Sequence, residues 1–394
     1  MSTPKGFQFS AVEAAIKKPG RLDLGMICSE TPAVAAAVFT TNKVKAAPVL
    51  LGMEQIRNGL CRAVVVNSGN ANACTGSQGL ADARETASLA ASELGIPDEL
   101  LQVSSTGVIG VPLPMARIRS AIPSLVAGLK RGSLADVASA IMTTDTFPKM
   151  ESRTGYAGGR EYTIAGIAKG AGMIMPNMAT MLAFIVTDAA VDTAWLTQVF
   201  REANDRSFNM ISVDGDTSTN DTALIMANGA AGNTPLGKGN PDAEQFVALL
   251  NEVLLSLAQM IVKDGEGATK FVTITVTGAA SIAEAKQAAM AVANSSLVKT
   301  AFFGQDANWG RILAAVGYSG ARVNQDRLSL MFDDVLMAEA GVFAGGDAEE
   351  RGTGVLRKKE FAVTIDLALG DGQATVYTSD LSYDYIKING DYRT

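Results

Sequence analysis

The stretch ending in Ala179 and Thr180 has the clearest potential for chemistry, because it places one small hydroxyl residue between a turn-forming segment and an apolar run. Two glycines, Pro176 and Asn177 precede Thr180, and the apolar residues 181–187 follow it. An internal threonine is a weak nucleophile, but a threonine at the start of a chain can pass its hydroxyl proton to its own α-amino group. Cutting the Ala179–Thr180 bond would therefore create a catalytic centre. The alternative interpretation is a threonine buried in a strand.

The absence of histidine restricts the chemistry further. A chain without histidine cannot use Ser-His-Asp or Cys-His catalysis and lacks the commonest metal ligand. Any acyl transfer must then use a lysine, a carboxylate or an α-amino terminus as its base. The three cysteines, Cys28, Cys61 and Cys74, show no C-x-x-C spacing, which argues against zinc and disulfides and fits a reducing cytoplasm.

Charge and hydropathy argue against two further classes of protein. The formal net charge is -7, whereas nucleic-acid binding needs a basic face. The first twenty residues lack the apolar core of a signal peptide. The longest apolar stretch, residues 171–186, is interrupted by Pro176, Asn177 and Thr180 and is too short to span a membrane. We therefore expect a soluble cytoplasmic protein that binds neither nucleic acid nor a membrane.

The pattern along the chain predicts an α/β protein. With 394 residues, 47% hydrophobic and 19% charged, the chain can form a globular protein of two or more subdomains. Helices and strands alternate without a strict βαβ order, which favours layers with mixed sheets, and no low-complexity linker separates the two sides of Thr180, so both sides should pack together. The predicted strands are 33–51, 62–67, 162–167, 181–187, 271–277, 327–332, 361–369 and 374–379, and the predicted helices are 81–94, 133–142, 193–205, 243–262 and 282–293.

Two polar loops could take part in the same chemistry. Residues 104–110, SSTGVIG, form a small-residue turn that could present a hydroxyl and backbone N–H groups to a developing oxyanion. Residues 142–149 combine three threonines with Asp145 and Lys149 and could contact an amino-acid substrate. The structural alternatives are a strand-to-turn junction for the first loop and a capped loop after a helix for the second.

Charged residues near turns give weaker signals. Lys169 could pair with a substrate carboxylate, although most lysines lie at the surface. Glu266, between two glycines after the predicted helix 243–262, could bind a substrate ammonium or could be a solvated acid at the helix end. The acid-rich run 207–222 does not match an EF-hand calcium loop, because neither the order of its acids nor a closing glutamate fits.

Eight segments together resemble the ornithine acetyltransferase family, also called glutamate N-acetyltransferase, of arginine biosynthesis. They occur in the order found in the family and cover nearly the whole chain, so the set is far more specific than any one member. The segments are VVNSGNANACTG, SSTGVIG, MTTDTFPK, KGAGMIMPNMATML, SVDGDTSTNDT, DGEGATK, FFGQDANWGRILAAVGYSG and INGDYRT.

The resemblance implies that the chain cuts itself at Ala179–Thr180. The products would be an α chain of residues 1–179 and a β chain of residues 180–394, which stay associated as two copies of each. The implied fold is a layered α/β sandwich of mixed sheets, similar to N-terminal-nucleophile hydrolases but with its own topology. Thr180 would be the nucleophile of the matured enzyme.

The resemblance also implies the other site residues. The oxyanion hole of the family falls on Thr106 and Gly107. Its substrate-binding positions fall on Thr143, Lys169, Thr180, Glu266, Asn389 and Thr394, with Thr144 and Thr146 close enough to Thr143 to take its place. Lys169 would pair with the substrate carboxylate and Glu266 with the side-chain ammonium of ornithine. Thr394 would contribute if the C-terminus folds over the site.

The implied reaction is a ping-pong transfer of an acetyl group. The Thr180 hydroxyl takes the acetyl group from N2-acetyl-L-ornithine, ornithine leaves, and L-glutamate accepts the group. The freed α-amino group has an unperturbed pKa of about 7.7–8.0 and can act as the general base. The reaction needs no metal or organic cofactor, and acetyl-CoA could be a second donor. The alternatives are an amide hydrolase with an N-terminal threonine and a non-catalytic binding protein whose Ala179–Thr180 bond stays intact.

Overall fold

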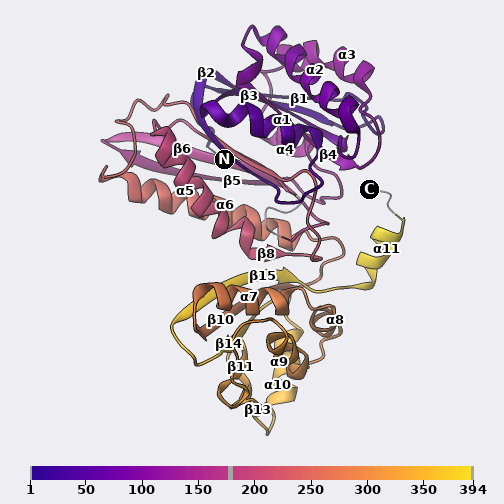
Figure 1. Cartoon of the computed structure of the whole chain (residues 1–394), viewed down its shortest axis with the longest axis vertical. Helices are drawn as coiled ribbons and strands as arrows, with labels where there is room; N and C mark the ends of the chain where they lie inside the picture. The colour runs from indigo at the N-terminus through magenta and orange to yellow at the C-terminus, as the bar shows by residue number, and fades with distance from the viewer. Residues whose placement is uncertain (1, 176–180, 392–394) are drawn as a thin grey trace. The chain divides into compact units, whose positions relative to one another are not determined.

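Two β-sheets, each in its own compact unit, organise the chain (Figure 1). The computed structural model describes residues 2–175 and 181–391, so Ala179, Thr180 and Thr394 lie outside the described residues. The first unit contains the residues up to Asn209 and Asp216–Ile261, and the second contains Met210–Gly215 and the residues from Val262 onward. The first unit therefore includes residues from both sides of the predicted cleavage site.

The first unit is built on an eight-stranded mixed sheet with the order β4-β3-β2-β9-β7-β6-β5 and β1 paired with β2. The pairs β3–β4 and β7–β9 are parallel, and the other neighbours are antiparallel. All six residues of β7 are buried, as expected for a strand covered on both faces. The strands are β1 (Phe7–Val12), β2 (Leu24–Phe39), β3 (Leu60–Asn70), β4 (Leu101–Val108), β5 (Lys149–Ala157), β6 (Arg160–Lys169), β7 (Leu182–Thr187) and β9 (Thr222–Ala227).

Helices cover both faces of this sheet. One cluster of buried apolar side chains joins α2 and α3 to β2, β3 and β4, and another joins α4 to the opposite-facing residues of β2 and β3. Asp192 caps α5 by accepting a hydrogen bond from the Trp195 N–H at 2.8 Å. The helices are α1 (Ala47–Gln55), α2 (Gly76–Leu94), α3 (Met115–Ala127), α4 (Leu134–Ala140), α5 (Thr193–Asp205) and α6 (Ala243–Lys263).

Among the described helices, α6 is long and apolar enough to cross a membrane by length and composition. Its apolar side chains have another explanation, because the helix packs on the first sheet. A Cβ at Gly166 of β6 would come within 2.9 Å of Leu257 on this helix, so glycine permits the close approach. Arg153 of β5 pairs with Glu252 of α6 at 2.8 Å. These contacts are those of a helix packed on a core.

The second unit contains a seven-stranded mixed sheet with the order β13-β12-β11-β14-β10-β15-β8. Buried alanines of α7 pack on alternate residues of β10. The small-residue face of the helix and the buried face of the strand therefore belong to one core. The strands are β8 (Ile211–Ser212), β10 (Phe271–Ala279), β11 (Ser329–Phe332), β12 (Val335–Glu339), β13 (Val342–Phe343), β14 (Glu360–Asp366) and β15 (Gly372–Ser379), and the helices are α7 (Ile282–Ala293), α8 (Ser296–Gly304), α9 (Trp309–Gly317), α10 (Ala348–Leu356) and α11 (Tyr383–Asp391).

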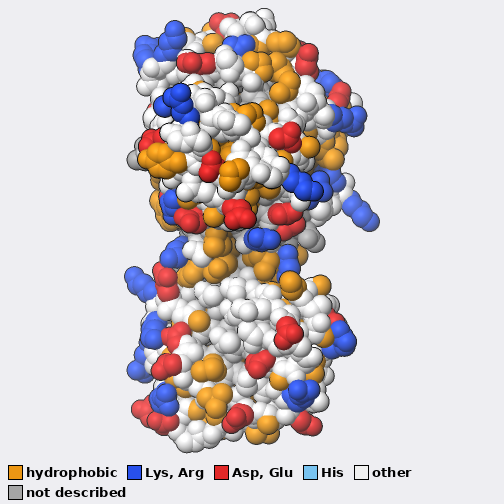
Figure 2. Space-filling view, turned by 90° about the vertical axis from the view of Figure 1, so that its left-hand side faces the viewer, with side chains coloured by type: hydrophobic (Ala, Val, Ile, Leu, Met, Phe, Trp, Pro, Cys, Tyr) orange, Lys and Arg blue, Asp and Glu red, His pale blue; other side chains and the backbone are white. Residues whose placement is uncertain are grey.

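Basic and acidic side chains are interspersed on the surface shown in Figure 2. Blue Lys and Arg side chains alternate with red Asp and Glu side chains on the visible part of each unit. That face therefore offers no continuous basic surface of the kind that binds nucleic acid.

The predicted α/β class with mixed sheets is confirmed, as are the five predicted helices and most strands. The prediction of strand over residues 33–51 is wrong at its end, because β2 stops at Phe39 and α1 starts at Ala47. Pro48 occupies the first turn of α1, where its fixed φ and missing N–H are tolerated. A short apolar run of this kind does not distinguish a buried strand from a helix.

A matched pair of leucine substitutions tests the assignment of α6 to the core of the first unit. Leu250 is 0% exposed, whereas Leu50 in α1 is 48% exposed. Leu250→Ala should lower the free energy of unfolding by about 2–5 kcal/mol, because it leaves a cavity, and Leu50→Ala should change it by less than about 0.5 kcal/mol. Urea denaturation measures both, and equal effects of the two substitutions would contradict this packing.

Candidate active site

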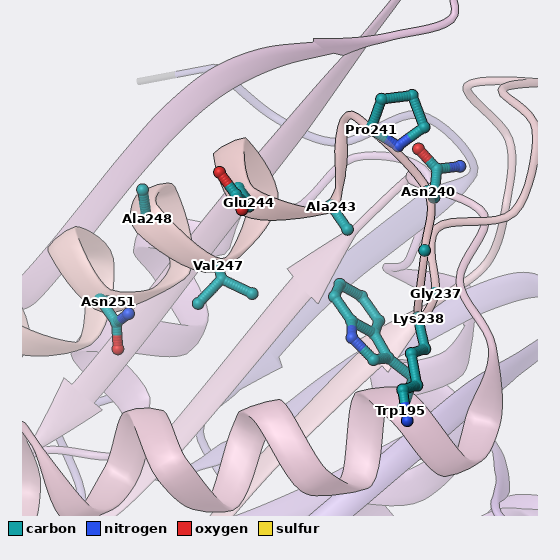
Figure 3. Close-up of a pocket in the computed structure, with 11 residues that line it drawn as sticks. Trp195, Gly237, Lys238, Asn240, Pro241, Ala243, Glu244, Val247, Ala248 and Asn251 are labelled. Carbon is teal, nitrogen blue, oxygen red and sulfur yellow. The ribbon is translucent and has the colours of Figure 1, made fainter.

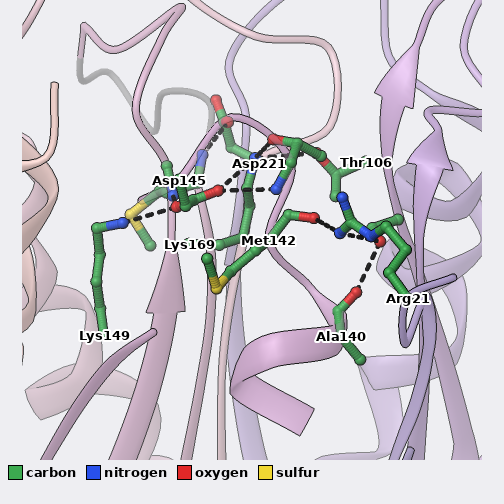
Figure 4. Close-up of polar contacts among 12 residues, drawn as sticks. Arg21, Thr106, Ala140, Met142, Asp145, Lys149, Lys169 and Asp221 are labelled. Atoms are coloured by element: carbon green, nitrogen blue, oxygen red, sulfur yellow. Dashed lines mark hydrogen bonds and ion pairs between the residues drawn. The ribbon is translucent and has the colours of Figure 1, made fainter. Parts of the chain in front are cut away.

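Lys169, the last residue of β6, is a buried cation that joins two predicted site residues (Figure 4). It is 3% exposed. Its Nζ donates to the Thr143 hydroxyl at 2.8 Å and to the Thr106 hydroxyl at 3.3 Å. Asp145 Oδ2 lies 3.9 Å from the same nitrogen. Since a buried charge is stable only with such partners, Lys169 fixes the two hydroxyls beside a positive charge.

Asp145 joins the loop after α4 to strands β5 and β6. Its Oδ1 accepts hydrogen bonds from Lys149 Nζ and from the Gly170 N–H, both at 2.7 Å. Its Oδ2 accepts the Thr143 N–H at 2.9 Å. The side chains of Asp145 and Lys149 are both completely buried. This loop is therefore held by a buried ion pair, whose removal on one side only is costly.

The charge of Asp145 persists into acid. Burial by itself raises the pKa of this carboxyl, but the charges of Lys169 and Lys149 and the hydrogen bonds that it accepts outweigh burial and lower the pKa from 3.8 to about 2. The carboxylate therefore remains ionised at any pH near neutrality and balances the two buried ammonium groups.

Thr106 and Gly107 lie near the end of β4, which pairs in parallel with β3. Gly107 has φ +134°, and a Cβ at this position would collide with the backbone of Gly69 and Asn70 in β3. Only glycine fits this close approach. The sequence SSTG thus lets β4 continue to a point where the Thr106 hydroxyl lies beside Lys169.

Ser105, the residue before Thr106, is held on two sides. Its hydroxyl donates to Asn67 Oδ1 at 2.6 Å, and its carbonyl accepts Asn220 Nδ2 at 2.8 Å. Asn220 Nδ2 also donates to the Ala71 carbonyl at 2.6 Å. Three distant segments of the chain are thereby tied together next to the predicted oxyanion hole.

The chain just after the predicted cleavage site is also fixed. Asp221 Oδ1 accepts the Met181 N–H at 2.8 Å, and the Met181 carbonyl accepts the Thr222 N–H at 3.1 Å. Strand β7 starts at the next residue, and its register places Leu182 opposite Lys169 in β6. The start of β7 therefore lies beside the strand that carries the buried ammonium.

Two other predicted site residues contact each other in the second unit. Asn389 of α11 donates its Nδ2 to Glu266 Oε2 at 2.9 Å and to the Tyr385 carbonyl at 3.1 Å. Glu266 belongs to the turn after α6. The pair presents a carboxylate and an amide, which together could bind an ammonium group.

The structure thus brings Thr106, Thr143 and Lys169 together in the first unit and pairs Glu266 with Asn389 in the second. The contact with Lys169 supports Thr143 among the three neighbouring threonines of its loop. The predicted residues outside the described parts of the chain are Ala179, Thr180 and Thr394. The reaction roles of all these residues remain predictions.

The environment of two acids, Asp145 and Asp221, is not predicted by the sequence. Asp145 and Lys149, considered as possible substrate contacts, are buried and bind each other. Asp221 lies in the segment SVDGDTSTNDT, which contributes to the family resemblance, but the sequence assigns this acid no role of its own. The available signal was its position directly before a strand of six buried residues, where an acid needs a specific partner.

A cavity of about 620 Å³ lies elsewhere in the first unit, beside the start of α6 (Figure 3). Trp195 of α5 and Val247 of α6 form part of its apolar lining, and Glu244 and Asn251 add polar groups. None of the predicted site residues lines it. Across residues 2–175 and 181–391, no cluster of three acidic or cysteine side chains is arranged to hold a metal ion.

The sequence matches the ArgJ family over residues 8–394. The arginine biosynthesis bifunctional protein ArgJ of Geobacter sulfurreducens is 75% identical over 390 residues, which cover 99% of each chain. The crystal structure of arginine biosynthesis bifunctional protein ArgJ from Bacillus halodurans is 39% identical with a TM-score of 0.51 and covers 53% of this chain and 98% of that chain. The structure of ornithine acetyltransferase complexed with ornithine from Mycobacterium tuberculosis is 40% identical with a TM-score of 0.40 and covers 44% of this chain and 93% of that chain.

Asp145→Asn tests the buried charge cluster. The folded pKa of Asp145 is lowered to about 2, below an unfolded value of about 3.9, so its contribution to stability is present above about pH 4 and is lost as pH falls toward 2. The variant should lose about 3–5 kcal/mol at pH 7, because two buried ammonium groups lose their counter-charge.

The difference in unfolding free energy between wild type and Asp145→Asn should shrink between pH 4 and pH 2, as measured by urea denaturation. Glu85→Gln, which breaks an exposed pair with Arg119, is the control and should have little effect at any pH. A difference for Asp145→Asn that is constant with pH would contradict the lowered pKa.

Proposed function

The chain belongs to the ArgJ family, and from this premise we propose that it cuts its own Ala179–Thr180 bond and then carries acetyl groups on the Thr180 hydroxyl. The protein is an acetyltransferase of arginine biosynthesis, with ornithine acetyltransferase and glutamate N-acetyltransferase activities. The proposal concerns the residues that perform this activity and the order of the chemical steps.

The observation that carries the proposal is the arrangement of groups beside the start of β7. Lys169 holds the Thr106 and Thr143 hydroxyls, and Leu182, two residues after Thr180, is its register partner. Lys169 and the Thr106 hydroxyl thus lie near the start of β7, and Gly107 follows Thr106 in the chain. These are the groups that an oxyanion at this position would require.

The length of a solved relative supports the cut. The Bacillus halodurans chain matches over 98% of its own length but over only 53% of this one, so that polypeptide is about half as long. Residues 180–394 are 215 of the 394 residues, about 55% of the chain. A separate polypeptide of this size fits a division at Ala179–Thr180 into an α chain and a β chain.

In the precursor, the Thr180 hydroxyl attacks the Ala179 carbonyl. The peptide C–N bond breaks, an ester to the Thr180 oxygen forms, and the proton of the hydroxyl moves to the nitrogen. Water then hydrolyses the ester and leaves a carboxyl group on Ala179 and a free α-amino group on Thr180. This amine is the base that a chain without histidine otherwise lacks.

In the mature enzyme, the amine of Thr180 removes the proton of its own hydroxyl during attack on the acetyl carbonyl of N2-acetylornithine. The Thr106 hydroxyl and the Gly107 N–H stabilise the oxyanion, and one such donor contributes about 2.7–4 kcal/mol. Ornithine leaves with the proton, and glutamate then attacks the acetyl-threonine. The Glu266 carboxylate receives the side-chain ammonium of ornithine, with Asn389 beside it.

The assembly and location follow the same proposal. Two α and two β chains form the enzyme, and the chain acts in the cytoplasm. The strand pairing between β6 and β7 and between β7 and β9 explains how the two products of cleavage remain associated, because these backbone hydrogen bonds join residues from both sides of Thr180.

Substitution of Thr180 tests the cleavage. Thr180→Ala should remain a single chain on a denaturing gel and release no ornithine from N2-acetylornithine, because it has no nucleophile. Thr180→Ser should keep part of both functions. Thr197→Ala, on the exposed face of α5, is the control and should behave as wild type. An active wild-type enzyme that runs as one full-length band would contradict the proposal.

The choice of acceptor separates transfer from hydrolysis. Release of ornithine should depend on added glutamate, because glutamate regenerates the free Thr180 hydroxyl. Release at an equal rate without glutamate would identify an amide hydrolase. With acetyl-CoA in place of N2-acetylornithine, formation of N-acetylglutamate would show that acetyl-CoA is a second donor, and its absence would restrict the enzyme to the recycling transfer.

A further inference from the structure

Asp221 is a completely buried acid that holds the backbone immediately after the proposed cleavage site. Its Oδ1 accepts the Met181 N–H at 2.8 Å (Figure 4), and the following residue, Thr222, donates its N–H to the Met181 carbonyl at 3.1 Å. The Asp221 carbonyl accepts the Thr40 N–H at 3.0 Å. Both polar backbone groups of Met181 are therefore bound by one short segment that is itself anchored to the chain after β2.

The second carboxyl oxygen of Asp221 has no donor. Oδ2 is buried and makes no hydrogen bond. The nearby Thr40 hydroxyl has a single proton, which it donates to the Ser218 carbonyl at 2.7 Å. A buried carboxyl oxygen without a partner costs free energy, so its presence calls for an explanation.

Asp188, a comparable acid at the other end of β7, shows that this fold can provide donors to both oxygens of a buried carboxyl group. Asp188, which follows β7, is also buried, but both of its oxygens accept backbone hydrogen bonds. Oδ1 accepts the Thr163 N–H at 2.7 Å, and Oδ2 accepts the Lys5 N–H at 3.0 Å. Asp188 thus shows the arrangement of an acid that only holds the backbone, whereas Asp221 leaves one oxygen for another group.

The pKa of the Asp221 carboxyl is consistent with an Oδ2 that receives no hydrogen bond. Burial raises the pKa of this carboxyl well above its usual value, although the hydrogen bond from Met181 and the charge of Lys169 act in the opposite direction. Lys169 is in turn paired with Asp145, which is bound to Lys149. Burial thus favours the neutral form of the Asp221 carboxyl, whereas a cation next to Oδ2 would favour its charged form.

We propose that Asp221 is a positioning residue that holds Thr180 through Met181 and whose Oδ2 is the partner of the α-amino group created by cleavage. This inference rests on the proposed function. The Met181 nitrogen is bonded to the Thr180 carbonyl carbon, and successive Cα atoms are about 3.8 Å apart, so the new amine arises within one residue of the Asp221 carboxyl. In the precursor the Thr180 nitrogen is part of the neutral peptide bond to Ala179.

The Asp221 carboxyl and the Thr180 α-amino group can share one proton, so none has to be taken from or released to solvent. When the carboxyl is protonated and the amine is neutral, the amine is free to take the proton of the Thr180 hydroxyl. When the proton moves from Oδ2 to the amine, the products are a carboxylate and an ammonium that attract each other. Asp221 thus holds the base in place and keeps it from pairing with a substrate carboxylate.

Asp221→Asn tests this inference, because asparagine keeps an oxygen for the Met181 N–H but replaces Oδ2 with a group that cannot accept an ammonium proton. We expect a folded variant that still cuts itself on a denaturing gel, because the Met181 N–H keeps its acceptor and the amine does not yet exist in the precursor. Once cut, its kcat for transfer from N2-acetylornithine to glutamate should fall at least 10-fold with little change in KM. The acid limb of its kcat profile should move to lower pH, because the amine loses a counter-charge that favours its protonated form.

Asp188→Asn is the matched control and should leave the cleavage rate, kcat and the pH profile unchanged. An Asp221→Asn enzyme with kcat and pH profile equal to wild type would overturn the inference while leaving the proposed function intact, whereas an uncut but active wild type would overturn both.

A crystal structure of the mature wild-type enzyme gives an answer that does not depend on the folding of a variant. The Thr180 nitrogen should lie within about 3.2 Å of Asp221 Oδ2, the reach of a hydrogen bond. A separation beyond that reach, with no water between the two atoms, would overturn the inference.

Discussion

The buried carboxylate of Asp145 is the interaction on which the site depends, because two lysines share it. Lys149 binds it directly at 2.7 Å, and Lys169 lies 3.9 Å away. Without this negative charge, two ammonium groups would be buried without a counter-charge, which is costly. With it, Lys169 can give hydrogen bonds to two hydroxyls while the carboxylate lies 3.9 Å away. Asp145 therefore balances the charge of Lys169, while the N–H donors of Lys169 are directed at Thr106 and Thr143.

The first sheet fixes the position of the start of β7 relative to these buried charges. Strand β7 lies between β9 and β6, so its register is fixed on both edges. A slip of one residue would exchange its buried faces, since both are covered. Met181, just before the strand, is held by Asp221 and Thr222. Because the register and these two bonds agree, the chain that continues from Thr180 enters the sheet at one place only, beside Lys169.

Local elements could be predicted from the sequence, whereas contacts across the chain could not. The helix over residues 193–205 could be predicted, because helical spacing is a property of neighbouring residues. The helix starting at Ala47 was missed, because its apolar run is short and its proline suggests a break. The two sheets, and the division of the chain into units that does not coincide with Thr180, arise from pairings between residues far apart in sequence.

The same limit applies to the site. Thr106, Thr143 and Lys169 were named from a resemblance, and nothing in their spacing shows that they meet. Asp145 was named for its charge, but its partner Lys149 is only four residues away, and the pair could equally have been solvated in a loop. What decides its burial is Gly170, whose N–H comes from the end of another strand to the same oxygen. That contact depends on the tertiary fold.

An enzyme without histidine must obtain its base from another group, and the proposed cleavage supplies it at the cost of a peptide bond. A permanent amine inside a protein is costly, because a buried ammonium needs a counter-charge. A peptide nitrogen is neutral, so the precursor can fold around it while Lys169 is already balanced by Asp145. Under the proposal, the charge of the amine arises only after the sheet has formed, next to Asp221, whose Oδ2 has no hydrogen-bond partner. Folding first and creating the base afterwards avoids burying an unpaired ion during folding, which is a physical reason for making the nucleophile by self-cleavage within a finished core.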